Sequence, residues 1–264
     1  MRLFVKKKVL KLTFLGTGTS QGVPIIGSNH PVCLSKNTKD KRLRCAAMLS
    51  WGDFSYAIDV GPDFRQQMLI NRINRLDGIL ITHEHTDHII GLDDIRPFFY
   101  KEKKDIPLYA EKRVFDEIIP RFKYIFESQS KYPGTPNVVL NEISDQASFV
   151  IGGKQIQPIR VIHGKLPILG FRVENLVYCT DVKSVPETSL KHFEGLDVLV
   201  INALREEEHF SHFTLEEALV FIKKINPKKA YLTHISHLLG FHDKVEQNLP
   251  NNVHLAYDGL ALNL

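Results

Sequence analysis

Short apolar runs recur along the chain and predict β-strands. In each run, β-branched and other apolar residues alternate with polar ones or follow one another without a break, and turn-forming residues bound the run. The runs that meet this description are residues 9–15, 55–60, 77–82, 155–162, 166–173, 176–179, 197–202, 229–233 and 253–256.

Amphipathic stretches between these runs predict helices at residues 62–71, 112–122, 215–224 and 241–247. In the third stretch Leu215, Ala218 and Ile222 recur at helical spacing, so we expect one face of this helix to pack in the core. Thr214 and Glu217 have the spacing of a capping box at its start.

The predicted strands and helices are interspersed along the whole chain. No linker, repeat or low-complexity segment divides them. A chain of 264 residues with 43% hydrophobic residues is large enough to bury a sizeable core. The pattern therefore predicts a single layered domain over residues 1–264, of the α+β or α/β class.

Composition narrows the class of protein. Lys and Arg total 34 against 30 Asp and Glu, a net charge of +4 that tolerates an anionic substrate without requiring one. The clearest basic cluster, residues 6–8, is interpreted as a solvated lead-in to the first strand, and a nucleic-acid-binding protein usually has a denser basic patch. Three widely spaced cysteines argue against a disulfide framework. No secretory signal or run of ~18 apolar residues is visible, so we predict a soluble cytoplasmic protein.

The most informative stretch is THEHTDH, at the end of the predicted strand 77–82. It carries His83, His85, Asp87 and His88. Such a short peptide cannot wrap all four side chains around one tetrahedral ion, whereas two adjacent ions could share them. In an extended segment His83 and His85 lie on one face, and a following turn would redirect Asp87 and His88 to a second ion. The stretch therefore predicts half of a dinuclear metal site.

The remaining ligands are expected at other strand ends. His163 precedes Gly164, Asp181 follows the run LVYCT, and His234 follows the run AYLT. A rigid sheet can direct side chains at such strand-to-loop junctions toward a common point.

These residues resemble the HxHxDH signature of the metallo-β-lactamase superfamily, and the resemblance covers nearly the whole chain. It implies an α+β fold, an αββα sandwich of two mixed β-sheets flanked by helices, with the metal ions at one edge. Asp59, in the run IDVG, is similar to an early aspartate that supports the site without binding metal. The implied ligands are His83, His85 and His163 for one ion, Asp87, His88 and His234 for the other, and Asp181 as the bridge between them.

The opening loop GTGTSQGVPIIG, residues 16–27, resembles the start of enzymes related to phosphoribosyl 1,2-cyclic phosphate phosphodiesterase. Those relatives hold an additional structural zinc ion with three cysteines and a late histidine. The matching residues here are Ser28, His30, Cys33 and His237. Because serine is a poor zinc ligand, this second site could keep three protein ligands or hold no metal, and both alternatives stay open.

His212 lies just before the predicted helix 215–224. It resembles the histidine that faces the scissile phosphate in ribonuclease Z and its phosphodiesterase relatives, although Phe213 stands between His212 and Thr214 here. His209 is the neighbouring alternative. The implied role is to protonate the leaving oxygen or to stabilise the transition state, which typically accelerates a reaction about 10²–10⁴-fold.

The sequence thus predicts a metal-dependent phosphodiesterase acting on a small phosphodiester, cyclic or linear. Two ions bridged by Asp181 would lower the pKa of a shared water to about 7 and supply hydroxide. Asp87, Asp181 and His212 are therefore the predicted catalytic residues. Zinc and manganese suit the ligand set about equally well.

Several other functions use the same signature. A tRNA 3′-processing nuclease like ribonuclease Z is the nearest one, but no Gly- and basic-rich arm is apparent, so nucleic acid is not the favoured substrate. A thioester hydrolase like glyoxalase II is disfavoured by His212 and by the opening loop. A flavodiiron-type redox protein would need a flavin domain, and a binding module with a degenerate site would not keep all seven implied ligands. Related enzymes are often dimers, which leaves a homodimer open.

Overall fold

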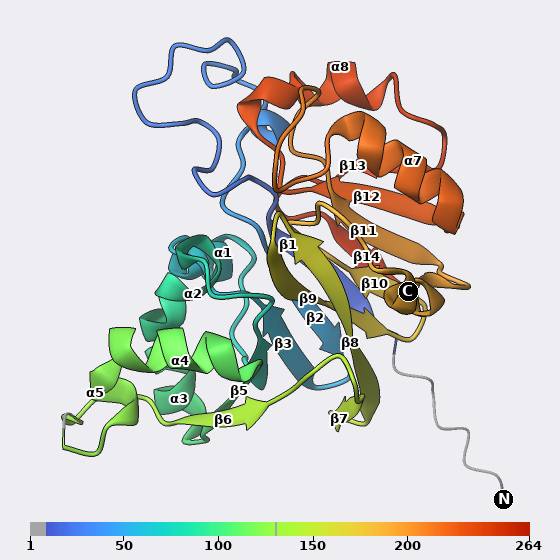
Figure 1. Cartoon of the computed structure of the whole chain (residues 1–264). Helices are drawn as coiled ribbons and strands as arrows, with labels where there is room; N and C mark the ends of the chain where they lie inside the picture. The colour runs from blue at the N-terminus through green and yellow to red at the C-terminus, as the bar shows by residue number, and fades with distance from the viewer. Residues whose placement is uncertain (1–8, 130) are drawn as a thin grey trace, which may run out of the picture.

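The computed structural model describes residues 9–129 and 131–264, so the basic cluster at residues 6–8 lies outside the described residues. Two sheets of seven strands face each other, and helices cover their outer faces (Figure 1). The predicted αββα sandwich of two mixed sheets is confirmed. In spatial order the first sheet contains β14 (Ala261–Asn263), β1 (Lys11–Gly16), β2 (Ala46–Trp51), β3 (Phe54–Ile58), β4 (Gly78–Leu80), β5 (Ile106–Ala110) and β6 (Val138–Glu142).

The second sheet repeats this arrangement. Each sheet has an antiparallel part, which includes β14-β1-β2-β3 in the first, and a part with parallel pairs, which includes β3-β4-β5-β6. In spatial order the second sheet contains β13 (Val253–Leu255), β12 (Lys229–Thr233), β11 (Val198–Asn202), β10 (Leu176–Tyr178), β9 (Leu166–Val173), β8 (Lys154–His163) and β7 (Phe149–Ile151).

The helices are short, and none in the described chain is long and apolar enough to cross a membrane. The α-helices are α1 (Phe64–Ile70), α2 (Thr86–Ile89), α3 (Arg96–Glu102), α4 (Lys112–Arg121), α5 (Lys123–Phe126), α6 (Glu187–Leu190), α7 (Leu215–Ile225) and α8 (His242–Glu246). The 3-10 helices are η1 (Thr38–Asp40), η2 (Ile90–Ile95), η3 (Lys191–Phe193) and η4 (His237–Leu239).

Buried apolar clusters hold the layers together. Between the sheets, Phe14, Phe171 and Tyr178 are among the largest fully buried side chains. The outer face of the first sheet packs against α1, α3 and α4, and that of the second against α7 through Ala218 and Ile222. Burying one large apolar side chain contributes about 1.5–3 kcal/mol. The sandwich is therefore a well-packed support for the loops at its edges.

The predicted capping box of α7 is confirmed. The Thr214 hydroxyl accepts a hydrogen bond from the Glu217 backbone N–H at 3.1 Å, and the Glu217 carboxylate accepts one from the Thr214 N–H at 2.8 Å. These bonds satisfy two of the donors that a helix start leaves unpaired. The N-cap of α7 is thereby fixed two residues after His212.

The sequence pattern misses β2, β5, β6, β7 and β14, and it misses the short helices α2, α3, α5 and α6. The alanines of β2 suit a helix as well as a strand, and β5 contains Pro107, which usually argues against a strand interior. Strands β7 and β14 have three residues each, too few to show a period. These elements form through pairing with neighbours that are distant in sequence.

The topology brings many strand ends to one edge. In the first sheet β3 and β4 run parallel. In the second sheet β10, β11 and β12 run parallel, and β8 runs in their direction because both β8 and β10 are antiparallel to β9. The carboxyl ends of parallel strands open at the same edge of a sheet, which is the usual place for a site in such folds. Asp59, His83, His163, Asp181 and His234 all lie at or just beyond such ends.

Candidate metal centre

The THEHTDH segment changes conformation in its middle. His85 is extended, with φ −61° and ψ 145°, and it is the N-cap of α2. Asp87 and His88 lie within this four-residue helix. The turn expected after His85 is thus one helical turn, which directs Asp87 and His88 away from the face that His83 and His85 share.

Two glycines allow this helix to approach the loop after β3. A Cβ at Gly61 would lie 2.0 Å from the backbone oxygen of Asp87, and a Cβ at Gly91 would lie 2.0 Å from the backbone oxygen of Gly61. Only glycine fits at such distances. The Val60 N–H donates to the His88 carbonyl at 2.7 Å, which ties the two segments together. The loop that carries Asp59 is thereby held against the helix that carries His88.

Three of the histidines are oriented by a partner on their outer nitrogen, Nδ1. An outer hydrogen bond of this kind fixes the ring and points Nε2 inward, the usual arrangement of histidines that bind a metal ion. The Nδ1 contacts are His83 to Thr82 Oγ1 at 3.0 Å, His88 to Asp59 Oδ2 at 2.7 Å, and His163 to the Ser211 carbonyl at 2.8 Å.

The inward-facing ligand atoms form two overlapping groups. The ligand atoms of His83, His85 and His163 lie within 4.8 Å of one another, and so do those of Asp87, Asp181 and His234. Asp181 also belongs to a group with His83 and His88. The structure therefore brings together all seven side chains that were predicted as ligands, with Asp181 between the two groups.

His88 supplies the observation that tests whether metal ions fit. Its Nε2 is buried and has no hydrogen-bond partner among the described residues. It lies 3.2 Å from Asp87 Oδ2 and 3.6 Å from Asp181 Oδ2. A buried nitrogen that makes no hydrogen bond and lies next to two carboxylates is a place where a divalent cation can stand in for a proton. The donor set of imidazoles and carboxylates suits divalent ions such as zinc or manganese.

Burial and the carboxylates of the site shift the pKa values of its side chains in opposite directions. Burial lowers the pKa of His83 well below its usual value, and neutral imidazole is the form that binds a metal ion. Burial would also lower the pKa of His88, but nearby carboxylates, led by that of Asp87, outweigh it and raise the pKa. Burial would raise the pKa of Asp181, yet His234 outweighs it and holds the pKa well below its usual range. The carboxylates are ionised at neutral pH, and their charge is what divalent cations would offset.

Three site residues adopt left-handed backbone conformations that non-glycine residues rarely use. The φ angles are 64° at Asp59, 59° at Asp181 and 53° at His234. Each such residue costs about 1–3 kcal/mol, and such strain gathers at functional sites. At each position the chain leaves its strand sharply, so the side chain is directed at the sheet edge.

Several residues that support the ligands are not apparent from the sequence alone. Thr82 donates its hydroxyl to Asp59 at 2.9 Å while it also contacts His83, so it links two parts of the site. Thr19, in the opening loop, has its hydroxyl 3.3 Å from His234 Nε2. The one available signal was a threonine directly before several of the ligands, as in Thr82 before His83, Thr180 before Asp181 and Thr233 before His234.

Buried groups beneath Asp181 and His234 add to this support. The Thr180 hydroxyl donates to Asp181 and lies 3.4 Å from His234 Nδ1. It also contacts Cys45 Sγ at 3.4 Å, and this thiol lies 3.3 Å from the Tyr178 hydroxyl. These side chains fill the space under the ligands with paired polar groups, which fixes the ligand rotamers.

His212 lies against the predicted ligands. Its ring centroid is 4.5 Å from that of His163 and 4.8 Å from that of His234. Its Nδ1 is buried without a hydrogen-bond partner among the described residues, and burial lowers the pKa of His212 to about 2. His209, the alternative, is one ring further out, with its centroid 5.1 Å from that of His212. The structure thus places His212, and not His209, next to the centre.

The second zinc site, predicted in the N-terminal loop, is only partly assembled. The rings of His30 and His237 meet at 4.8 Å, and His237 Nδ1 has no hydrogen-bond partner in the described chain. Cys33 instead packs in a small apolar cluster with Val23 and Val32. Among the described residues, no group of three or more His, Cys, Asp or Glu side chains close enough to share a metal ion includes His30, Cys33 or His237. The Ser28 hydroxyl accepts a hydrogen bond from the His30 backbone N–H at 3.2 Å. A zinc ion at this place stays a prediction.

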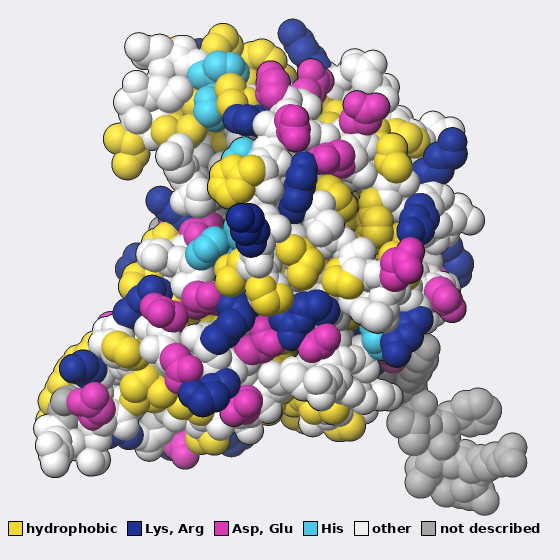
Figure 2. Space-filling view, viewed as in Figure 1, with side chains coloured by type: hydrophobic (Ala, Val, Ile, Leu, Met, Phe, Trp, Pro, Cys, Tyr) yellow, Lys and Arg dark blue, Asp and Glu magenta, His cyan; other side chains and the backbone are white. Residues whose placement is uncertain are grey.

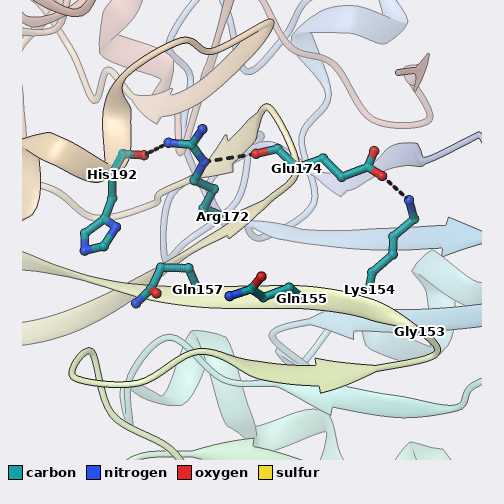
Figure 3. A pocket seen from close by; sticks show the side chains of 7 residues that line it. All are labelled: Gly153, Lys154, Gln155, Gln157, Arg172, Glu174 and His192. Atoms are coloured by element: carbon teal, nitrogen blue, oxygen red, sulfur yellow. Dashed lines mark hydrogen bonds and ion pairs between the residues drawn. The ribbon is translucent and has the colours of Figure 1, made fainter.

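A separate cavity of about 470 Å³ lies at the other end of β8, far along the strand from His163 (Figure 3). Its charged groups are engaged with one another. Lys154 pairs with Glu174 at 2.6 Å, and Arg172 donates to the carbonyls of Glu174 and His192 at 2.9 and 2.8 Å. This cavity has no cluster of metal-type side chains, so we do not count it as a second reaction site.

Comparison with known proteins agrees with the geometry. A model of the Beta-lactamase superfamily domain matches residues 56–235. A crystal structure described as a new diphosphatase from the PhnP family is 37% identical, with a TM-score of 0.90, and the match covers 97% of this chain and 98% of that one. Ribonuclease Z of Staphylococcus epidermidis is 27% identical over 62% of this chain and 49% of its own length.

An octanoyltransferase of Porphyromonas gingivalis is 38% identical over 95% of this chain but only 51% of its own length. The chain thus spans about half the length of these two curated relatives. The activity in the name of such a longer protein belongs to that whole protein.

Proposed function

The chain belongs to the metallo-β-lactamase superfamily, whose members with such a site are metallohydrolases, and from this premise we propose that it is a metal-dependent phosphodiesterase. Its substrate in this proposal is a small phosphodiester, cyclic or linear. The fold alone does not select a substrate, because one fold hosts many reactions. The choice depends on the groups around the centre.

The position of His212 carries the choice of phosphodiester. A ligand atom of His212 lies within 4.8 Å of those of His163 and Asp181, so its ring faces the same space as the ligand atoms. An imidazole N–H at this place can donate to an oxygen of a tetrahedral phosphorus centre, which develops charge on several oxygens at once. A planar thioester would need such a donor only at its single carbonyl oxygen.

Some residues of the site would bind the metal ions, and His212 would interact with the substrate. His83, His85, His88, His163 and His234, with Asp87 and Asp181, would hold two divalent ions. When bound, such ions activate water at neutral pH and neutralise phosphate charge. Asp59 and Thr82 keep the rings of His88 and His83 aimed inward. His212, neutral at this buried position, would present its imidazole N–H as a hydrogen-bond donor to the leaving oxygen.

Hydrolysis of a diphosphate is a second candidate. It is favoured by the 37% identical structure, whose description names a diphosphatase. The same site could serve both reactions, because a diphosphate ester also presents a phosphorus atom with an oxygen leaving group. Phosphate leaves more readily than a sugar alkoxide, so a diphosphate would depend less on a proton from His212.

A substrate panel tests the proposal. Metal-loaded protein is assayed with bis(p-nitrophenyl) phosphate, a ribose cyclic phosphate, a dinucleoside diphosphate, an acyl thioester and a tRNA precursor. We expect the protein to hydrolyse the phosphate esters, and we expect a chelator to abolish this hydrolysis. Faster hydrolysis of the thioester, or cleavage confined to the tRNA precursor, would contradict a small-molecule phosphodiesterase.

The role of His212 is tested separately with His212→Ala. Turnover of an alkyl phosphodiester should fall about 10²–10⁴-fold, because a poor leaving group needs the proton. An activated aryl ester should lose less than about tenfold. Metal content should not change, and His209→Ala is the matched control, for which we expect near-normal turnover. Equal losses on both esters would show that His212 stabilises charge without assisting the leaving group.

A further inference from the structure

Phe210 is a large apolar side chain that is 81% exposed and lies near Gly164, the residue after the predicted ligand His163. Among the described residues it belongs to none of the buried apolar clusters. Its ring packs against the imidazole of His209, with centroids 4.8 Å apart and planes inclined by 30°. Contact with one neighbouring ring leaves most of the phenyl surface open to solvent.

The ring is held at the rim of the site from two sides. Phe210 Cδ2 lies 3.7 Å from the position that a Cβ of Gly164 would occupy, and Gly164 directly follows the predicted ligand His163. The next residue, Ser211, accepts the His163 Nδ1 hydrogen bond through its carbonyl. Its backbone N–H also lies 3.3 Å from His209 Nδ1, which fixes the turn. Phe210 is therefore placed by the same contacts that orient His163.

A row of aromatic rings leads from the centre to this position. The ring of His163 lies 4.5 Å from that of His212, which lies 5.1 Å from that of His209, against which Phe210 packs. Figure 2 shows histidine, basic and hydrophobic side chains together on the surface beside the hollow at the left of the molecule. A substrate bound at the centre would extend along such a row toward the rim.

We propose that Phe210 is a stacking platform for a nucleobase, and that the substrate is a phosphodiester that carries a nucleoside. This inference rests on the proposed function, because it extends the same site. An exposed phenyl ring has a flat face on which any nucleobase can stack, and stacking does not depend on the hydrogen-bonding groups of the base. The base would lie on Phe210 while the phosphate lies at the metal centre.

The test measures binding, so it does not depend on turnover. The affinities of AMP and ribose 5-phosphate for metal-loaded protein are compared by calorimetry, since the two ligands differ only in the base. We expect AMP to bind the unaltered protein roughly 5- to 100-fold more tightly, the usual range for stacking of one base. Phe210→Ala should remove most of that preference and leave the affinity for ribose 5-phosphate unchanged.

Two further variants sharpen the result. Phe210→Leu keeps an apolar side chain without a flat ring, so it should lose most of the preference as well. Val220→Ala, which truncates an apolar residue 65% exposed on α7, should bind both ligands normally. Equal affinities for AMP and ribose 5-phosphate in the unaltered protein, or equal losses for both in Phe210→Ala, would overturn the proposal.

The remaining alternative is that a second copy of the chain covers Phe210. Sedimentation of the unaltered protein and of Phe210→Ala decides this, because a dimer that dissociates in the variant would overturn the stacking role. The two proposals fail in different ways. Absence of any phosphodiester hydrolysis with an intact preference for AMP refutes the phosphodiesterase alone, and normal hydrolysis without that preference refutes the platform alone.

Discussion

The two groups of metal-type side chains in this molecule differ in how they are supported. At the sheet edge, seven side chains bring their ligand atoms into overlapping groups. In the N-terminal loop, His30 and His237 meet, but Cys33 packs with apolar neighbours. The edge residues leave strands of two packed sheets, whereas His30 and Cys33 lie in a long loop that is outside both sheets and is tied by isolated β-bridges such as Val23 to Arg42.

The two groups also differ in the hydrogen-bond partners of their histidine Nδ1 atoms. At the edge, Nδ1 of His83, His88 and His163 each has a partner. At the second group, the nearby Val32 N–H donates to His30 Nδ1 at 3.3 Å, and Nδ1 of His237, in η4, has no hydrogen-bond partner in the described structure. Preorganised ligands lose little conformational freedom on binding a metal ion. We therefore expect metal at the edge and none in the loop.

The largest effect is expected where the two edge groups share a ligand. Asp181→Asn keeps the shape of the side chain but removes the negative charge between the groups. Uncompensated buried charge typically costs about 3–5 kcal/mol, which corresponds to a loss of roughly 10²–10⁴-fold in turnover. Activity and metal content of the variant are the measurements. Normal turnover with both ions bound would show that Asp181 does not couple the two groups.

A smaller effect is expected from a residue that supports a ligand without binding metal. Asp59 accepts hydrogen bonds from the Thr82 N–H and hydroxyl and contacts His88 Nδ1. Asn offers only one oxygen, so Asp59→Asn cannot keep all three contacts. Loss of such an outer partner typically costs about 10–100-fold in metal affinity. Titration with metal measures it, and Asp63→Asn, which alters a carboxylate paired with Arg44, is the control.

The smallest effect is expected in the loop. His30→Ala removes a partly exposed imidazole from a site that the structure assembles only in part. The free energy of unfolding should change by no more than about 0.5 kcal/mol, as for most surface substitutions. Thermal denaturation with metal analysis checks this. A marked drop in melting temperature together with the loss of one metal equivalent would place a structural zinc ion in the loop.

The contrast also explains what could be predicted from sequence. His83, His163, Asp181 and His234 lie at the ends of apolar runs, and the other three ligands follow His83 within a few residues, so the strand pattern and the positions of His and Asp locate them. The supporting residues Thr19 and Cys45 gave no such signal, because Thr19 is 215 residues from its partner His234 and Cys45 is 133 residues from Tyr178. Such contacts appear only when both sheets are assembled.

The loop group shows the opposite limit of sequence reasoning. His30, Cys33 and His237 were a reasonable ligand set by residue type and by resemblance. Whether they meet depends on the path of a loop that has little secondary structure, and no periodicity specifies that path. Residue type predicts which chemistry is available, and strand topology decides which side chains converge.

The number of metal ions bound per chain tests this account most directly. Purified protein is loaded with zinc or manganese, desalted, and analysed by mass spectrometry for metal content. We predict two equivalents, both retained in His30→Ala and at least one lost in Asp181→Asn. One equivalent or none in the unaltered protein, or a third equivalent that disappears in His30→Ala, would contradict the expectation that the sheet edge binds two ions and the loop binds none.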